Sequence, residues 1–320
     1  MADLGVGVNL PWLEYGQDFG ASAWRPRGGV GQADQRQRMR EALDRVAETG
    51  ARLVRWWLLG DGRAGLQETA AGPGVRHDQR LFDDVGAAVD ALRQAGLQVI
   101  FVVTDFLWFA PARIVDGVQT GGRRYLARDD ALRRELMESV FAPIAQRWGD
   151  EPAIAAWDLC NEPEWATLGL GTLDPRRALS RRQMRAFLRD LVSTFRSRAG
   201  QPLTVGLASA RWLPFVRGLG LDLYQVHWYD GLDPVATLAR PVAALGLDRP
   251  LLLGEFPTRG ASLPPSAIVE KAAAAGYCGA LAWSLLARDR ATDGAACAEA
   301  LFECNAAAGA GPLAGLPERA

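Results

Sequence analysis

The sequence predicts an α/β fold, a single (β/α)8 TIM barrel with long strand-to-helix loops. Eight short apolar runs alternate with segments of helical spacing along the 320 residues. Continuous apolar strands separated by helices indicate a parallel sheet covered by helices, and eight such units suit a closed barrel. An open doubly wound sheet has the same alternation, but no Gly-x-Gly-x-x-Gly follows the first run, and the count of eight favours closure.

The strands are predicted from apolar runs of five to eight residues, several of them rich in valine, isoleucine and aromatic residues. In chain order they are expected at 6–10, 53–58, 99–103, 154–161, 203–207, 223–227, 251–255 and 279–283. The helices are predicted where apolar residues recur at helical spacing, as Met39, Leu43 and Val46 do in the first one. They are expected at 34–48, 81–94, 130–148, 180–198, 213–217, 235–245, 265–275 and 295–307.

The connections between these elements are unequal. A glycine suited to a left-handed helix C-terminus stands shortly before most of the later strands, at positions 50, 96, 149, 200, 220, 246 and 276. The links from helix to strand are therefore short. The links from strand to helix are often long, at 11–33, 60–79, 106–129 and 163–179. In a barrel, this inequality predicts an elaborated binding face at the carboxyl ends of the strands. We expect one domain over 1–320, with about 306–320 as a loosely ordered tail.

The composition excludes several classes of protein. The net charge of −1 gives no indication of binding to nucleic acid or to an anionic membrane. No apolar run approaches the 18 residues of a membrane span, and residues 1–5 lack the features of a signal peptide. We expect a cytoplasmic protein, or a secreted one if a leader has been removed. Four cysteines match no metal motif and are expected to be free thiols.

Two glutamates stand where apolar strands end. Glu162 follows the run 154–161 and precedes Pro163, and Glu255 lies at the end of the run 251–255, with Pro257 close behind. On a ring of eight strands, the fourth and seventh ends face each other across the barrel mouth. Two carboxylates about 5 Å apart suit retaining glycoside hydrolysis, and a larger separation suits the inverting route. Neither route needs a metal or an organic cofactor, so none is expected.

The segment Trp157-Asp158-Leu159-Cys160-Asn161-Glu162-Pro163 resembles the Asn-Glu-Pro motif of clan A glycoside hydrolases, family 5 most of all. The resemblance implies that Glu162 is the general acid/base and that Asn161 binds the sugar 2-hydroxyl and the nucleophile. Leu253-Gly254-Glu255-Phe256 is similar to the strand-seven motif of the family, which implies that Glu255 is the nucleophile.

Further positions extend the resemblance from the second strand to the eighth. His227-Trp228-Tyr229 resembles the family's His-x-Tyr, which implies that His227 lies beside the acid/base and that Tyr229 holds the nucleophile. Arg55 stands where the family places an arginine that pairs with the nucleophile. Trp283 resembles the tryptophan that forms the floor of the subsite before the scissile bond. The resemblance thus implies a retaining β-glycosidase with a carbohydrate substrate.

The chain departs from the family at the end of the third strand, where family 5 enzymes commonly carry a histidine. Asp105 is the expected occupant here, and its carboxylate could accept bonds from two sugar hydroxyls. Tryptophans in the predicted loops are expected to stack on sugar rings: Trp12, Trp24, Trp108, Trp165, Trp212 and Trp228. Glu164 is expected either to bind the leaving sugar or to face solvent.

The sequence is compatible with three hypotheses for the function. The first is hydrolysis of β-linked oligosaccharides or glycosides, with manno- or gluco-configured sugars favoured. The second is transglycosylation by the same two glutamates, and the third is a catalytically silent sugar-binding barrel. The last is disfavoured because a binding protein has no need for both glutamates together with Asn161, His227 and Tyr229.

Overall fold

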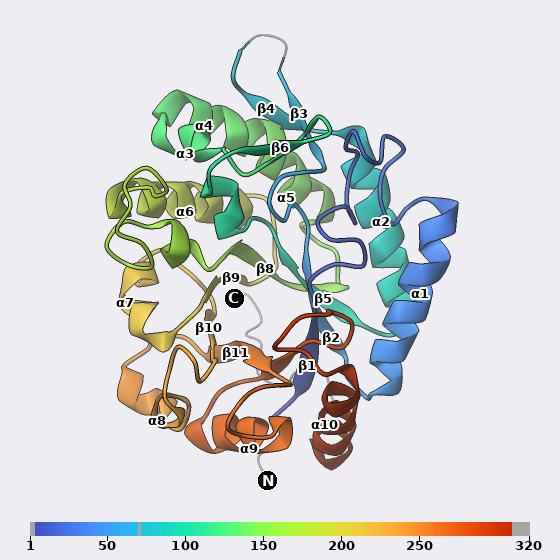
Figure 1. The fold of residues 1–320 in the computed structure, drawn as a ribbon, viewed down its shortest axis with the longest axis vertical. Helices are drawn as coiled ribbons and strands as arrows, with labels where there is room; N and C mark the ends of the chain where they lie inside the picture. Colours follow the sequence, from blue (N-terminus) through green and yellow to red (C-terminus); the bar gives the residue numbers. More distant parts are fainter. Residues whose placement is uncertain (1–3, 70–71, 309–320) are drawn as a thin grey trace.

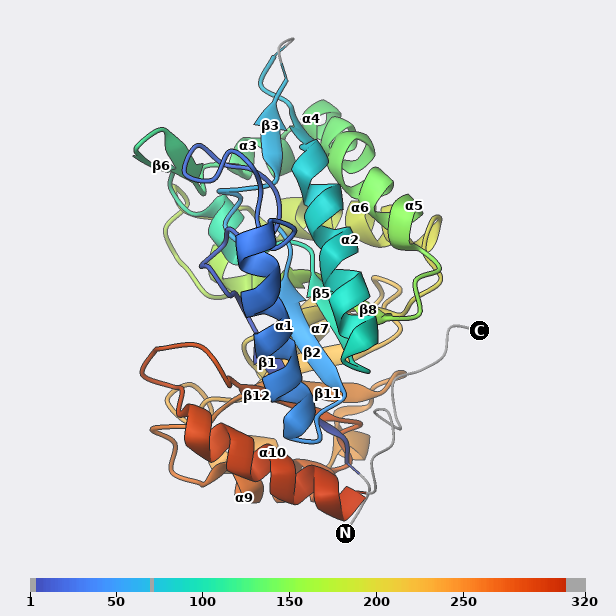
Figure 2. The same cartoon turned by 90° about the vertical axis from the view of Figure 1, so that its right-hand side faces the viewer.

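A computed structural model describes residues 4–69 and 72–308 of the chain. Its central element is a closed barrel of eight parallel strands, in the order β1-β12-β11-β10-β9-β8-β5-β2 (Figures 1 and 2). The strands are β1 (Val6–Leu10), β2 (Leu53–Trp57), β5 (Gln98–Val102), β8 (Ile154–Asn161), β9 (Leu203–Leu207), β10 (Tyr224–His227), β11 (Leu251–Pro257) and β12 (Ala280–Trp283). The predicted (β/α)8 barrel is confirmed.

Helices cover the outer surface of the barrel (Figure 2). They are α1 (Ala33–Glu48), α2 (Gln79–Gln94), α3 (Arg124–Arg128), α4 (Asp130–Leu136), α5 (Ala142–Trp148), α6 (Arg181–Arg196), α7 (Leu213–Val216), α8 (Val235–Leu238), α9 (Pro265–Ala275) and α10 (Gly294–Ala308). Short 3-10 turns add η1 (Phe106–Phe109), η3 (Pro163–Ala166), η4 (Ala210–Trp212) and η5 (Val242–Leu245). None of the helices in the described part of the chain combines the length and apolar composition that a membrane span needs.

Two predicted helices differ from those observed. The helix expected at 235–245 is instead α8 followed by η5, whereas the short one expected at 213–217 is confirmed as α7. The helix expected at 130–148 is interrupted by a π-helical segment, η2 (Met137–Phe141). Pro143 explains this interruption, because it has no N–H for the carbonyl of Ser139 four residues earlier. That carbonyl instead lies 2.7 Å from Nδ1 of His77.

Two long loops contain hairpins that the sequence did not predict. The strands β3 (Leu66–Glu68) and β4 (Val75–His77) form one, and β6 (Arg113–Val115) and β7 (Val118–Thr120) form the other. Strands of three residues are too short to show a repeating pattern. Residues 306–308 belong to α10, and the rest of the tail expected at about 306–320 lies outside the described residues. The loosely ordered tail and a single domain over 1–320 stay predictions.

The barrel interior has an apolar layer beneath a polar one. The apolar layer consists of Leu223, which directly precedes β10, and of buried side chains from five strands: Leu53, Ile100, Ala156, Leu252 and Leu281. Side chains two residues apart on a strand share a face. Two residues nearer the carboxyl ends, three of these positions are followed by the polar side chains Arg55, Asp158 and Gln225. The alternation within each strand thus places a polar layer at the mouth of the barrel.

Two glycines make room for this polar layer. A Cβ on Gly206 would lie 2.6 Å from Nε2 of Gln225 and 2.9 Å from Nη2 of Arg55, closer than real contacts allow. A Cβ on Gly254 would lie 2.5 Å from Cγ of Gln225. Any side chain at either position would displace Gln225, which donates a hydrogen bond of 2.8 Å to Asp158.

The loop between β1 and α1 is held by three buried aspartates that accept mainly backbone N–H groups. Asp18 accepts from two backbone N–H groups at 2.7 Å and from Nε1 of Trp56 at 2.8 Å. Asp84 accepts from the N–H groups of three loop glycines at 2.7–2.8 Å, and Asp78 accepts from Ala21. These bonds give the loop a defined conformation, and the loop carries Trp12 and Tyr15 toward the barrel mouth.

Candidate active site

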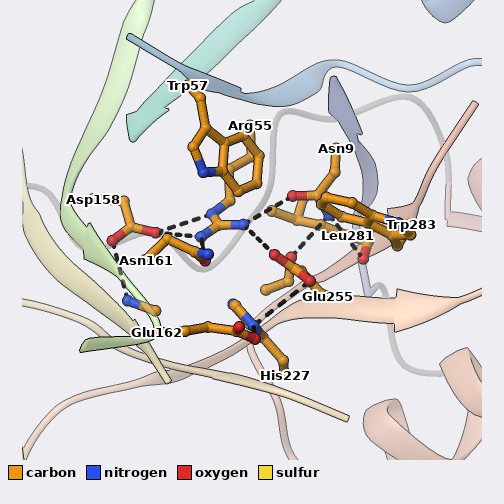
Figure 3. A network of polar contacts seen from close by, with 12 residues as sticks. Asn9, Arg55, Trp57, Asp158, Asn161, Glu162, His227, Glu255, Leu281 and Trp283 are labelled. Carbon is orange, nitrogen blue, oxygen red and sulfur yellow. Dashed lines mark hydrogen bonds and ion pairs between the residues drawn. The ribbon is translucent and has the colours of Figure 1, made fainter. Parts of the chain in front are cut away.

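Glu162 and Glu255 meet at the carboxyl ends of the barrel strands. Glu162 directly follows β8, and Glu255 lies within β11 (Figure 3). One carboxylate oxygen of each residue and one ring nitrogen of His227 all lie within 4.8 Å of one another. This separation matches the value of about 5 Å that leaves no room for a water molecule between two carboxylates.

Glu162 has a strained backbone, and its carboxylate is largely buried. Its φ of +46° lies in the left-handed region, and its N–H donates to the carbonyl of Gly206 at 2.7 Å. Non-glycine residues in that region cluster at functional sites, because the surrounding structure must hold them there. The carboxylate lies 2.8 Å from Nδ1 of His227 and accepts from Nε1 of Trp165 at 2.9 Å. Burial raises the pKa of Glu162 to about 7, although Arg55 opposes the rise.

Glu255 is held by one bond on each carboxylate oxygen. Oε1 accepts from Nη1 of Arg55 at 2.7 Å, and Oε2 accepts from the hydroxyl of Tyr229 at 2.9 Å. Burial raises the pKa of Glu255 above its ordinary value, whereas His227 and Arg55 lower it. The loss of solvent therefore outweighs both neighbouring groups in the net shift of the Glu255 pKa.

Arg55 is fully buried and lies at the centre of the polar layer (Figure 3). Besides Glu255, it pairs with Asp158 through Nε at 2.9 Å and Nη2 at 2.8 Å. It also donates to Oδ1 of Asn9 at 3.0 Å and to Oδ1 of Asn161 at 2.7 Å. A planar guanidinium can form this set of bonds because its donors point outward in a fixed plane. Arg55 thus orients both the Glu255 carboxylate and the Asn161 amide.

His227 lies between the two glutamates. Its Nδ1 is 2.8 Å from Oε1 of Glu162 and 3.6 Å from Oε2 of Glu255. Burial lowers the pKa of His227 to about 4, so the ring is neutral at neutral pH. The resemblance placed His227 beside the acid/base and Tyr229 against the nucleophile, and both side chains lie in those places.

Two groups of partly exposed aromatic rings flank the glutamates. On the side of Glu162, the rings of Trp165 and Trp212 meet edge to face at 5.5 Å. On the opposite side, Trp283 contacts the ring of Trp12 at 6.2 Å, and Trp12 contacts Tyr15 at 4.3 Å. Tyr15 is 46% exposed, so this second group extends to the protein surface. Flat apolar surfaces of this kind suit the C–H faces of sugar rings.

Three site predictions are wrong. Trp108 is fully buried and donates to the carbonyl of Leu59 at 3.3 Å, and Trp228 is 2% exposed. Both rings turn into the core rather than toward the barrel mouth, so neither can stack on a sugar. Glu164 neither faces solvent nor reaches the cleft, because the turn η3 buries it completely and its Oε1 accepts the N–H of Ala208.

Asn9 and Trp57 are site residues that the sequence did not identify. Asn9 is the penultimate residue of β1, and it donates to the carbonyl of Gly254 at 2.9 Å while it accepts from Arg55. The ring of Trp57 lies 4.3 Å from the guanidinium of Arg55 and contacts Trp283 at 5.8 Å. Asn9 could have been found from the sequence, because it is a polar residue within an otherwise apolar strand. Trp57 carried no such signal, because adjacent Trp56 belongs to the core.

Glu162, His227 and Glu255 are the one group among residues 4–69 and 72–308 whose ligand atoms lie close enough to share a metal ion. The guanidinium of Arg55 already binds Glu255 at 2.7 Å and would repel a second cation there. An acid/base pair therefore explains this group better than a metal site. The four cysteines Cys160, Cys278, Cys297 and Cys304 are free, as predicted.

Comparison with known proteins supports the resemblance to family 5 glycoside hydrolases. No protein-family model matches the chain. A mannan endo-1,4-β-mannosidase of Cryptopygus antarcticus is 25% identical over 171 residues, which are 53% of this chain and 39% of that protein. The aligned segment therefore spans less than half of that relative. A mannan endo-1,4-β-mannosidase of Mytilus edulis is 22% identical over 317 residues, covering 87% of this chain and 82% of that protein.

Solved structures show the same fold. The crystal structure of an endo-1,4-β-mannanase from Eisenia fetida superposes with a TM-score of 0.78 at 19% identity. The superposition covers 94% of this chain and 91% of the Eisenia fetida chain. The match therefore extends over nearly the whole barrel and its loops.

Proposed function

We propose that this chain is a retaining β-glycoside hydrolase that cleaves internal β-1,4 bonds of mannose-containing oligosaccharides or polysaccharides. The observation that carries the proposal is the pair Glu162 and Glu255, whose carboxylate oxygens lie within 4.8 Å at the mouth of a (β/α)8 barrel. At this distance one carboxylate can attack the anomeric carbon directly while the other protonates the leaving oxygen.

In the first step, Glu162 gives its proton to the glycosidic oxygen, and the bond from that oxygen to the anomeric carbon breaks. An oxygen of Glu255 forms a new bond to the anomeric carbon, and the leaving sugar departs. In the second step, Glu162 takes a proton from a water molecule, whose oxygen displaces Glu255. The pKa of about 7 for Glu162 suits both steps, because this group must hold a proton first and accept one afterwards.

The neighbouring residues support these steps by orientation and charge. Arg55 stabilises the carboxylate of Glu255 before attack, and Tyr229 fixes its second oxygen. Neutral His227 can donate to Glu162 when that residue is ionised. Asn161, whose amide oxygen is bound by Arg55, offers an N–H group toward the sugar.

The two aromatic groups support binding of a chain on both sides of the cleaved bond. Trp165 donates to Glu162, so the Trp165–Trp212 group lies on the side of the leaving sugar. Trp283, Trp12 and Tyr15 lie on the other side, where the sugar that becomes bound to Glu255 would extend. Platforms on both sides favour action on internal bonds over removal of terminal sugars.

The choice of mannose rests on the names of the two relatives and the solved structure, which are all mannanases. Glucose remains the competing sugar, since it differs from mannose only at the 2-position.

The proposal is tested by incubating wild type and Glu255→Ala with β-linked manno-, gluco-, xylo- and galacto-oligosaccharides. We expect wild type alone to cleave manno-oligosaccharides and to release products that first appear as the β-anomer in NMR spectra. An initial α-anomer would contradict retention, and products longer than the substrate would indicate transglycosylation. Binding without any cleavage by wild type would favour a silent sugar-binding barrel.

A further inference from the structure

Asp105 occupies an unusual position beside the two glutamates. It follows β5, forms an isolated bridge with Asn161 and caps the turn η1. Its side chain is 5% exposed. Oδ1 accepts from the N–H of Leu107 at 2.8 Å, while Oδ2 accepts from Nε1 of Trp57 at 3.1 Å and from Nδ2 of Asn161 at 2.9 Å.

Every group that contacts this carboxylate is a hydrogen-bond donor, and both oxygens accept. An amide in the same place would point its NH2 group at a donor in either orientation. In one orientation it would face the N–H of Leu107, and in the other it would face the N–H groups of Trp57 and Asn161. Only a carboxylate satisfies all the contacts. The site therefore requires Asp105 for its chemistry as well as for its size.

The bond to Asn161 determines which way the Asn161 amide faces. Its oxygen accepts from Nη2 of Arg55 at 2.7 Å, and its nitrogen donates to Asp105 at 2.9 Å. Because an amide nitrogen carries two hydrogens, one of them remains for a ligand. If the Asn161 amide flipped, its NH2 group would face the N–H groups of Arg55, and its oxygen would face the carboxylate of Asp105. Both contacts would be unfavourable, so the amide has one orientation.

The bond to Trp57 extends the effect to the floor of the cleft. The ring of Trp57 lies 4.3 Å from Arg55 and contacts Trp283 at 5.8 Å. The single oxygen Oδ2 of Asp105 therefore links the amide of Asn161 to this aromatic floor. From its sequence position, the Asp105 carboxylate was expected to accept bonds from two sugar hydroxyls. Because Oδ2 already accepts two bonds from the protein and Oδ1 accepts one, Asp105 is poorly placed to do so.

We propose that Asp105 is a positioning residue that holds Asn161 so that its free N–H meets the 2-hydroxyl of the sugar at the cleaved bond. This inference rests on the proposed function, and it assigns recognition of one hydroxyl to the pair Asp105–Asn161. Loss of Asp105 should therefore matter only for substrates that carry this hydroxyl.

The test compares an aryl β-mannobioside with its analogue that lacks the 2-hydroxyl on the ring next to the aryl group. We expect Asp105→Asn to lower kcat/KM for the parent by about tenfold or more, the effect of an unsatisfied buried donor, and to change the value for the analogue by less than about threefold. The double variant Asp105→Asn/Asn161→Ala should lose no more than Asn161→Ala alone.

Asp84→Asn is the matched control, because Asp84 is also buried and accepts from three N–H groups, but in the loop after β1. It should lower the melting temperature and leave the ratio between parent and analogue unchanged. If Asp105→Asn does not fold, Asp105→Glu takes its place, since it keeps the charge but moves the oxygens, and the same selective loss is expected.

Equal losses of Asp105→Asn on parent and analogue, or no loss on either, would overturn the inference while the proposed function stands. Wild type that cleaves no mannoside would instead overturn the proposed function, and this inference with it. The two failures are therefore distinguished by the wild-type rate alone.

Discussion

Among the substitutions considered, replacing Arg55 by methionine has the largest expected effect on the stability of the fold. Arg55 is fully buried and forms ion pairs with Asp158 at 2.8 Å and with Glu255 at 2.7 Å. Methionine fills similar space but leaves both carboxylates without their cation. Removing one partner of a buried ion pair costs about 3–5 kcal/mol of stability, because the remaining charge stays out of water.

The expected change in melting temperature follows from the size of the chain. Unfolding entropy is about 2.1 cal/mol/K per residue, or about 0.7 kcal/mol/K for 320 residues. A loss of 3–5 kcal/mol therefore lowers the melting temperature by about 4–8 °C. Activity falls as well, because Arg55 lowers the pKa of Glu255 and its removal lets that pKa rise further. Glu255 then stays protonated to higher pH, and the acid limb of the pH–rate profile moves to higher pH.

Arg55→Lys separates charge from geometry. Lysine keeps the positive charge, so stability should fall by less than in Arg55→Met. Its single ammonium group cannot reproduce the planar set of bonds to Asn9, Asp158, Asn161 and Glu255, so activity should still fall at least about tenfold. Differential scanning calorimetry and a pH–rate profile measure both effects. An Arg55→Met variant that melts within about 1 °C of wild type would refute the reasoning.

Other predictions concern single contacts. The rate of cleavage should fall above about pH 7, because Glu162 must be protonated to act as the acid and its pKa is about 7; a flat profile from about pH 6 to 9 would contradict this. Tyr15→Ala should raise KM for manno-oligosaccharides without changing hydrolysis of aryl mannosides. Trp212→Ala should also raise KM for manno-oligosaccharides, because its ring lies on the side of the leaving sugar, and steady-state kinetics would measure both effects. Glu164→Gln should keep activity within about threefold of wild type. Burial raises the pKa of Glu164 well above its usual range, which favours the uncharged carboxyl, and glutamine keeps an acceptor for the N–H of Ala208. A larger loss would show that the charge of Glu164 matters.

Much of the fold could be predicted from the sequence because each barrel strand is buried on both faces and reads as an apolar run. The same reasoning located Glu162 and Glu255, since a polar residue at the end of such a run must emerge at the barrel mouth. The family resemblance added Arg55, His227 and Tyr229, whose positions agree with it, although their catalytic roles stay predictions.

The failures arise where tertiary packing decides the direction of a side chain. Trp108 and Trp228 stand in loops like Trp165, yet the first two turn into the core and the third lies at the cleft. Glu164 is only two residues from Glu162, but the turn η3 points it away from the cleft. No local pattern distinguishes these outcomes.

The role of Asp105 shows a different limit. Its place at the end of the third barrel strand was evident from the sequence, but its partners were not. Trp57 and Asn161 come from other strands, and only the closed barrel brings both donors to one oxygen of Asp105.

The central claim is that Glu255 attacks the sugar and carries it as a covalent intermediate. Incubation with a 2-deoxy-2-fluoro-β-mannosyl fluoride, followed by mass spectrometry of proteolytic peptides, tests it most directly. We predict one added fluorosugar on the peptide that contains Glu255, and none in Glu255→Ala. A label on Glu162, or turnover of natural substrates with no label on any residue, would contradict it.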